Sequence, residues 1–291
     1  MRCWQVVALA LVAGCGRYHF NEAAGDGGGD SIGSGPFGAP VLIPELVDTL
    51  ETSNPAVRPD ELEMFLVRRV DGMSEGNVYV THRTSTELPW GPTTLVPELN
   101  SGSDEAGLHL SSDGLTLWFA SARPGGAGMH DIYRTTRPSL TSPFDPPARV
   151  IELCSTMPEH NASVDDGELT VVMSRGLMPR ELYGSQRPDR ASAWRPPVVI
   201  PEISSASDDE ANPSLSPDGL TVYFATDRQS GNKDLWTTTR PTISDPFAAP
   251  VPVDGVNSTA GEYQAWVSAD AHVIYFSSDR SGTTSIYRAT R

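Results

Sequence analysis

A unit of 50 to 54 residues recurs five times between residue 37 and the last residue of the sequence. Its clearest copy runs from Trp194 to Arg240, with the turn sequence Ser-Pro-Asp-Gly at residues 216–219. The aromatic residues that open the copies are spaced by 53, 54, 50 and 53 residues: Phe37, Trp90, Phe144, Trp194 and Phe247. A fixed period of this length is typical of repeat architectures, in which each copy forms one supersecondary unit.

Two further features recur in the same register. Each copy closes with an arginine: Arg83, Arg137, Arg187, Arg240 and Arg291. Each copy also carries a tight-turn sequence, at residues 58–61, 112–114, 164–167, 216–219 and 268–271. In such a turn proline presets φ, aspartate bonds to nearby backbone and glycine accepts a positive φ. Glu61 and Ala271 replace this glycine, and the third copy has no aromatic residue at 171–174, so we expect these copies to be less regular.

The clearest copy predicts four strands, at residues 211–216, 220–226, 233–239 and 247–253. The second is apolar or small on both faces, which favours burial between neighbouring sheets. The prolines of the fourth favour an edge strand, where a missing N–H is harmless. Short strands at this spacing, without helical periodicity, predict an all-β fold. We expect a five-bladed β-propeller of four-stranded antiparallel blades over residues 37–291.

The two ends of the repeat region predict how the ring closes. It begins with an outer-strand sequence at residues 37–43 and ends with a third-strand sequence at residues 285–291. The last blade therefore lacks a fourth strand of its own. We expect residues 37–43 to pair with the C-terminal blade, so that deletion of residues 36–44 unfolds the domain.

The N-terminus predicts export. Arg2 precedes an apolar run over residues 4–13, about half of the ~20 residues that a membrane-spanning helix needs. Residues 1–14 therefore fit a secretory signal peptide. The sequence Val-Ala-Gly-Cys at residues 12–15 resembles the lipobox of bacterial lipoproteins. That resemblance implies cleavage before Cys15 and its acylation, which would anchor the chain stably in a membrane. The alternative is an ordinary secretory signal followed by a chance cysteine.

A spacer follows the proposed lipidation site. Residues 15–36 contain little apolar sequence and many Gly, Asp and Ser, which predicts a flexible linker. Gly16, rather than an aspartate that would resemble an inner-membrane retention signal, favours the outer membrane. We therefore expect a lipoprotein of the bacterial cell envelope, facing the periplasm or the cell surface.

The repeat also resembles a known family. Residues 216–224, Ser-Pro-Asp-Gly-Leu-Thr-Val-Tyr-Phe, followed by Asp-Arg at 227–228 and Asp-Leu-Trp at 234–236, are similar to the TolB-like, WD-type propeller repeat of bacterial envelope proteins. The resemblance covers about 255 of the 291 residues. It implies the propeller fold, but not one function, because this repeat occurs in proteins with unrelated roles.

Charge and cysteine content exclude some classes of partner. With 21 basic and 37 acidic residues the formal net charge is −16, which disfavours nucleic acid as a partner because both would be negative. Three cysteines with no CxxC spacing provide neither a disulfide framework nor a recognisable metal motif. We expect no metal, no cofactor and a monomeric chain.

Acidic residues recur just before the innermost strand of each predicted blade. The candidates are Glu105, Glu159, Glu210 and Glu262, while Glu51 of the first copy is one position off. At the mouth of a central channel they would form a negative funnel for a cation or a basic peptide. The alternative is that they pair with recurring arginines of adjacent blades: Arg123, Arg175, Arg228 and Arg280.

These observations favour a non-catalytic function. We predict no catalytic residues and a propeller that serves as a scaffold for binding a protein or a cell-wall component. The alternative is a glycoside hydrolase, because five-bladed propellers include enzymes resembling arabinanases, which use carboxylates from different blades at the channel mouth. None of the acids here stands in a recognisable glycosidase motif.

Overall fold

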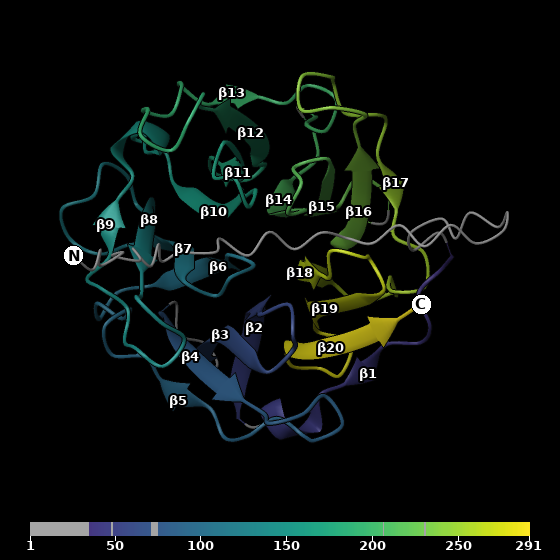
Figure 1. The fold of residues 1–291 in the computed structure, drawn as a ribbon. Helices are drawn as coiled ribbons and strands as arrows, with labels where there is room; N and C mark the ends of the chain where they lie inside the picture. Colours follow the sequence, from purple (N-terminus) through teal and green to yellow (C-terminus); the bar gives the residue numbers. More distant parts are fainter. Residues whose placement is uncertain (1–34, 48, 71–74, 206, 230) are drawn as a thin grey trace, which may run out of the picture. The chain divides into compact units, whose positions relative to one another are not determined.

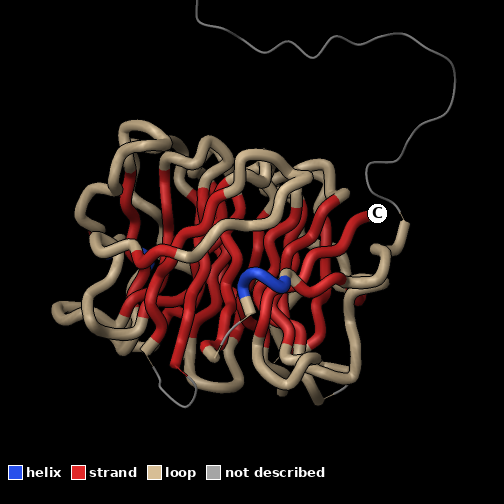
Figure 2. The backbone as a smooth tube through the Cα atoms, turned by 90° about the horizontal axis from the view of Figure 1, so that it is seen from below, coloured by secondary structure: helices blue, strands red, loops and turns tan. Residues whose placement is uncertain are grey.

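The computed structural model describes residues 35–291, apart from residues 48, 71–74, 206 and 230. The predicted signal peptide, Cys15 and the linker up to residue 34 lie outside the described residues. The described chain forms five four-stranded antiparallel sheets around a common axis, which confirms the predicted five-bladed β-propeller (Figure 1). Strands dominate the view in Figure 2. None of the helices in the described part is long and apolar enough to cross a bilayer.

The strands follow the repeat. Blade 1 contains β2 (Leu50–Val57), β3 (Glu63–Val70), β4 (Gly76–His82) and β5 (Thr94–Leu95). Blade 2 contains β6 (Glu105–Leu110), β7 (Thr116–Ser121), β8 (Asp131–Thr136) and β9 (Ala148–Arg149). Blade 3 contains β10 (Glu159–Val164), β11 (Thr170–Arg175), β12 (Glu181–Gln186) and β13 (Val198–Val199). Blade 4 contains β14 (Glu210–Leu215), β15 (Thr221–Thr226), β16 (Asp234–Thr239) and β17 (Val251–Pro252). Blade 5 contains β18 (Glu262–Val267), β19 (Val273–Ser278), β20 (Ser285–Thr290) and β1 (Val41–Leu42). Two short 3₁₀ helices, η1 (Pro44–Leu46) and η2 (Ile151–Leu153), precede blades 1 and 3.

The ring closes as predicted. β1, the first strand in the sequence, is the outermost strand of blade 5, where Val41 lies opposite Arg288 and Leu42 opposite Tyr287. Backbone hydrogen bonds extend the seam on both sides of β1: Gly38 N donates to Thr290 O (2.8 Å) and Ile43 N to Ile286 O (3.0 Å). The segment before blade 1 therefore completes the last blade.

The recurring turn, arginine and aromatic form one structural unit in every blade. The last turn residue has a positive φ, between 53° and 73°, in all five copies: Glu61, Gly114, Glu168, Gly219 and Ala271. The closing arginine donates from Nε to the carbonyl of that residue, at 2.6–3.0 Å. Its guanidinium also stacks over the opening aromatic, at 4.3–4.8 Å from the ring centroid. We call this unit the arginine clasp.

The bounds of the tight turn in blade 3 differ from the prediction. In blade 3 the turn occupies residues 165–168 instead of 164–167, because Asp165 N donates to Thr170 O and Glu168 takes the positive φ of 53°. The first and third blades also differ in detail from the others. β2 and β3 have eight residues each, and the bulge in β10 lies directly after Glu159.

The core is divided among the five blade interfaces. Each of five clusters of buried apolar residues contains side chains from two neighbouring blades. Adjacent residues of a second strand face opposite neighbours: Phe119 packs toward blade 1 and Trp118 toward blade 3. The opening aromatics lie in these interfaces too, and Trp194 meets Trp118 edge-to-face with ring centroids 6.2 Å apart. The second strands are therefore buried on both faces, as predicted.

Polar side chains connect the innermost strands across the axis. Buried Asn161 of blade 3 donates from Nδ2 to Gln264 Oε1 of blade 5 (2.8 Å). Gln264 Nε2 in turn donates to Leu108 O of blade 2 (2.7 Å). Non-adjacent blades thus meet at this level of the axis. We call the side on which the innermost strands begin the glutamate face, and the side of the tight turns the turn face.

Candidate functional site at the glutamate face

The four predicted glutamates occupy one equivalent position. Each is the first residue of an innermost strand, in β6, β10, β14 and β18, and each is 0% exposed: Glu105, Glu159, Glu210 and Glu262. The antiparallel register places each opposite the last residue of the second strand, as Glu105 lies opposite Ser121. The structure therefore brings the predicted residues to one level of the ring but turns their carboxylates into the blades.

Each glutamate has an arginine partner in its own blade. The distances between carboxylate and guanidinium are 3.6 Å for Arg123, 2.8 Å for Arg175, 3.0 Å for Arg228 and 2.8 Å for Arg280. The alternative that these glutamates pair with the recurring arginines is thus confirmed, but the arginines belong to the same blade and not to adjacent blades as we expected. The reason is the hairpin register, since each arginine lies two residues or fewer beyond the residue opposite the glutamate.

The same arginines hold other parts of the blade. Each donates to a backbone carbonyl of the connection that enters its own blade from the preceding one, at 2.6–3.0 Å: Leu99, Leu153, Ile203 and Val256. Each also stacks on aromatic rings of its own blade, as Arg280 does over Phe276 and Tyr287. Paired and hydrogen-bonded on several sides, these charges are compensated within the fold, as buried ions need to be.

Blade 1 has no glutamate at the equivalent position. The position equivalent to Glu105 is held by Thr52, whose hydroxyl donates to Leu46 O (3.2 Å). Glu51, which we noted as one position off, precedes it and is only half-buried. The ring of glutamates therefore has four members and not five.

A second set of charges links neighbouring blades at this face. Asp104 accepts hydrogen bonds from Arg69 Nη2 (2.9 Å) and Gly76 N (2.6 Å) of blade 1, and from His130 Nε2 (2.8 Å) of blade 2. Asp209 accepts from Arg180 of blade 3 through Nε (2.9 Å) and Nη2 (2.7 Å), and forms an ion pair with Lys233 of blade 4 (2.6 Å).

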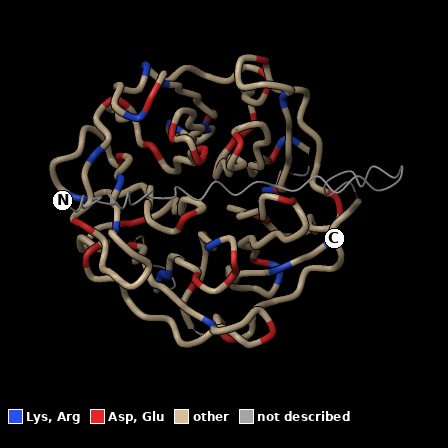
Figure 3. The backbone as a smooth tube through the Cα atoms, in the orientation of Figure 1, with Lys and Arg blue, Asp and Glu red and all other residues tan. Residues whose placement is uncertain are grey.

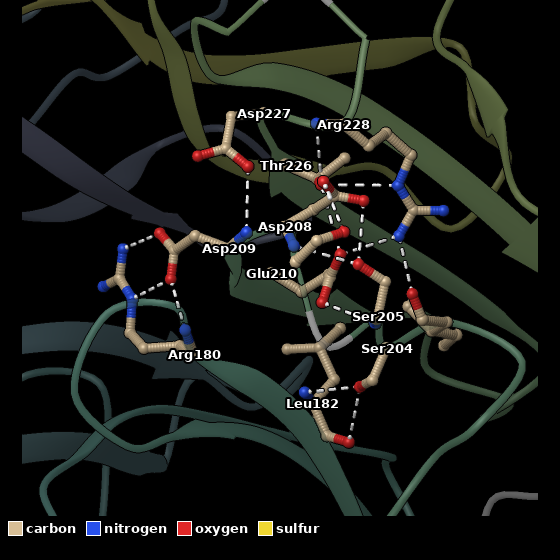
Figure 4. A network of polar contacts seen from close by, with 12 residues as sticks. Arg180, Leu182, Ser204, Ser205, Asp208, Asp209, Glu210, Thr226, Asp227 and Arg228 are labelled. Atoms are coloured by element: carbon tan, nitrogen blue, oxygen red, sulfur yellow. Dashed lines mark hydrogen bonds and ion pairs between the residues drawn. The ribbon is translucent and has the colours of Figure 1, made fainter.

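Figure 4 shows the two kinds of ion pair, within a blade and between blades, for blades 3 and 4. Arg180 points at Asp209 while Arg228 points at the neighbouring Glu210. Although burial acts to raise it, hydrogen bonds from Arg180 and Lys233 hold the pKa of Asp209 well below its ordinary value. Basic and acidic residues are correspondingly interspersed around the ring (Figure 3). The glutamate face therefore carries a network of mixed charge. The negative funnel remains a prediction, and the burial of its four glutamates argues against it.

An exposed apolar patch borders this network. Four large apolar side chains are 65%, 42%, 61% and 78% exposed: Met129, Met157, Leu177 and Met178. Their loops touch, since Gly128 lies against the backbone of residues 155–157 and Gly176 N donates to Pro158 O (2.9 Å). We call these four residues the methionine patch. Sequence reasoning missed it because the loops do not repeat, and exposure follows only from the fold.

The turn face holds a small polar cavity that the sequence did not predict. It has a volume of about 190 Å³ and lies between blades 2 and 3, lined among others by Asp113, Asp166, Glu168, Arg190 and Trp118. Glu168 is engaged there by Arg134 (2.8 Å) and Arg187 (3.0 Å). Its walls belong largely to the turns and clasps that form the blades.

Solved structures with this fold share little sequence with the chain. The catalytic domain of a GH62 α-L-arabinofuranosidase from Coprinopsis cinerea is 10% identical, with 88% of this chain and 96% of that chain covered and a TM-score of 0.59. An endo-arabinase from Bacteroides thetaiotaomicron is 13% identical, with 88% and 98% covered and a TM-score of 0.56. A putative TolB from Agrobacterium tumefaciens is 16% identical, with 84% and 79% covered and a TM-score of 0.47.

At these identities the similarity shows the fold alone. Among these structural neighbours the glycoside hydrolases have the higher TM-scores and the TolB protein the lower one. No family model matches the sequence, and a comparison with curated proteins found no match either.

Proposed function

We propose that the chain is a non-catalytic lipoprotein of the bacterial cell envelope whose propeller binds a protein partner through the methionine patch. The observation that carries the proposal is the exposure of Met129, Met157, Leu177 and Met178 on touching loops of two neighbouring blades. Clustered exposed apolar residues mark interaction sites, and flexible methionines suit binding surfaces because they adapt to the partner.

The rigid frame beneath the patch supports this role. Strands β8 and β10, which follow the loops of Met129 and Met157, are held by the buried interface between blades 2 and 3. Binding through loops on such a scaffold costs little ordering of the backbone. A cell-wall component is the other ligand class that the sequence suggested, and it is separated by the assay below.

The hydrolase alternative receives less support. Its catalysis would need two carboxylates that reach a substrate, one as acid and one as base or nucleophile. The four recurring glutamates are fully buried and bonded to arginines of their own blades. Burial raises the pKa of Glu159 and Glu210, but neither side chain contacts solvent.

Mild crosslinking in envelope fractions, followed by pull-down of the full chain, tests the proposal. The chain with Leu177→Glu and Met178→Glu should lose the crosslinked protein that wild type recovers. The matched control is Val198→Glu with Val251→Glu, which changes two exposed valines on the outer edge strands and should retain it. Equal recovery by the patch variant, or recovery only of peptidoglycan fragments, would contradict the proposed protein partner.

Two further assays separate the other parts of the proposal. Cys15→Ser should move the chain from the membrane fraction to the soluble fraction, because acylation at that residue is what we propose as its anchor. A screen of nitrophenyl glycosides and arabinan should give no turnover. Reproducible hydrolysis that disappears in a Glu210→Gln variant would instead establish the hydrolase.

A further inference from the structure

Three potential metal ligands converge at the junction of blades 2 and 3. They are Asp131, the first residue of β8; Cys154, directly after η2; and Glu159, the first residue of β10. One ligand atom from each, the Cys154 sulfur and a carboxylate oxygen of each acid, lies within 4.8 Å of the other two. The three residues come from separate segments, and the fold alone brings them together.

The carboxylate of Asp131 has an oxygen available for a ligand. The side chain is 1% exposed, and its Oδ2 accepts from the backbone N–H groups of Ala127 (2.8 Å) and Gly128 (3.4 Å). Its Oδ1 is buried without a nitrogen or hydroxyl donor, since the neighbouring Cys154 thiol is only a weak donor, and Arg149 Nη1 is 4.0 Å away. A buried carboxylate oxygen with only a weak thiol donor beside it is costly, and a coordinated cation would satisfy it.

Glu159 is held in place and still has capacity to coordinate. Its Oε1 accepts from Ser155 Oγ (2.6 Å) and Arg175 Nε (2.8 Å), and its Oε2 accepts from Ser155 N (3.2 Å). A carboxylate has about four lone-pair positions, so Oε2 retains one. Such hydrogen bonds to a carboxylate are the usual way in which proteins orient a metal ligand.

Comparison with the other blades shows what is particular to the cysteine. Val47 stands at this position before blade 1, and the other three blades have Asn100, Ser204 and Asn257, each of which bonds to the backbone of a third strand. Asn100 Oδ1 accepts from Val78 N (2.8 Å), Ser204 Oγ from Leu182 N (2.9 Å) and Asn257 Oδ1 from Leu235 N (2.8 Å). The Cys154 thiol makes the corresponding contacts as a weaker donor: it donates to Val150 O (3.2 Å) and Ile132 O (3.7 Å), where the Asn100 amide donates to Val96 O (2.8 Å) and Val78 O (3.0 Å). The fold therefore accommodates Asn, Ser or Cys at this position, and of these only the thiol places a sulfur ligand beside Asp131 and Glu159.

We propose that Asp131, Cys154 and Glu159 form a binding site for a thiophilic divalent metal ion of the zinc type. A thiolate among the donors selects such an ion over Mg²⁺ or Ca²⁺, which prefer all-oxygen sites. With bonds of about 2.3 Å to sulfur and 2.1 Å to oxygen, tetrahedral ligand atoms lie roughly 3.6 Å apart. The three side chains therefore need to close by about an ångström, and water completes the coordination.

The charges around the site favour a cation once the thiol has ionised. Burial, with the charge of Asp131 adding to it, raises the pKa of Cys154 to about 12, so the metal-free thiol is protonated. Metal binding releases that proton to solvent and leaves three anionic donors beside two cations, Arg149 and Arg175. The half-buried thiol gives the ion a route from solvent.

The test uses the full chain, stripped with chelator under reducing conditions and titrated with Zn²⁺, with Co²⁺ as a spectroscopic probe. Wild type should bind one more equivalent than Cys154→Asn, and Co²⁺ should show a thiolate charge-transfer band that this variant lacks. Cys3 and Cys15 are present in both proteins, so the difference reports Cys154. Cys154→Asn introduces the residue that two other blades carry at this position, so the variant should fold, and its metal-free melting temperature checks this.

A second variant isolates the carboxylate. Asp131→Asn should weaken Zn²⁺ binding by at least ~10-fold, because changes even to outer-shell partners of zinc ligands cost 10–100-fold. The control is Asp234→Asn, at the equivalent position of blade 4, where Asn257 stands in place of a cysteine. Absence of saturable Zn²⁺ binding to wild type, or the same stoichiometry and Co²⁺ spectrum in Cys154→Asn, would overturn the proposal.

Discussion

Deletion of residues 36–44 tests the closure of the ring. The segment buries Phe37 and Ile43, and the burial of two such side chains contributes about 3–6 kcal/mol. Outside the β1–β20 ladder its backbone adds three hydrogen bonds, from Phe37 N to Asp254 O and from Gly38 and Ile43 to β20, worth ~1 kcal/mol each. Stacking of Arg291 on Phe37, at 4.3 Å, adds roughly 0.5–2 kcal/mol.

The loss of about 6.5–11 kcal/mol is comparable to the whole stability of a typical domain, ~5–15 kcal/mol. At ~2–4 °C per kcal/mol for a chain of this size, the melting temperature should fall by at least about 13 °C, or the truncated chain should be unfolded at room temperature. Circular dichroism melts and urea titrations measure this. Gly255→Ala is a point-mutation counterpart, because a Cβ at Gly255 (φ +89°) would lie 2.0 Å from Phe37 O. An unchanged thermal transition in the truncated chain would refute the reasoning.

Three further predictions concern the arginine clasp, a buried ion pair and the histidines. Ala271→Gly should stabilise the chain by about 0.5–1 kcal/mol in urea titrations, because Ala271 has a φ of 56°, whereas Ala269→Gly, with no positive φ to relieve, should destabilise it. Arg137→Met should cost about 3–5 kcal/mol by leaving Glu63 of blade 1 without its buried partner, and adding Glu63→Gln should recover much of it; additive losses would contradict the pairing. Burial lowers the pKa of His109 and of His160 to about 4, so the unfolded chain takes up protons first; stability should be full above pH 6.5, fall as the pH drops from 6.5 toward 4, and fall less in a His109→Gln/His160→Gln variant.

The fold was predictable because each diagnostic residue has a local cause that repeats. The turn sequence at residues 216–219, the arginine at 240 and the aromatic at 247 meet in one clasp, so their recurrence in sequence reflects one recurring contact. The one-residue error in the turn of blade 3 has the same origin. Gly167 stands beside the position that takes the positive φ, and Glu168 adopts that φ instead of a glycine.

The site was less predictable because recurrence does not reveal where a side chain points. The glutamates that begin β6, β10, β14 and β18 recur as clearly as the turns do, but the hairpin register directs them to arginines of their own blades. The methionine patch has no periodic signal, since it depends on non-repeating loops being brought together. Cys154 did carry a signal, because an alignment of the copies places it against Asn100, Ser204 and Asn257.

The seam at β1 also determines how the ring bears mechanical load. A pull on the chain from its N-terminal side reaches the ring at Pro36 and Phe37, which connect to Asp254 of blade 4 and Arg291 of blade 5. Beyond them the load meets the hydrogen bonds of Gly38 and β1, and these can break one after another. The strand that completes the circle is then the first to detach, so under tension the ring would open at this seam before any blade is torn from its neighbour.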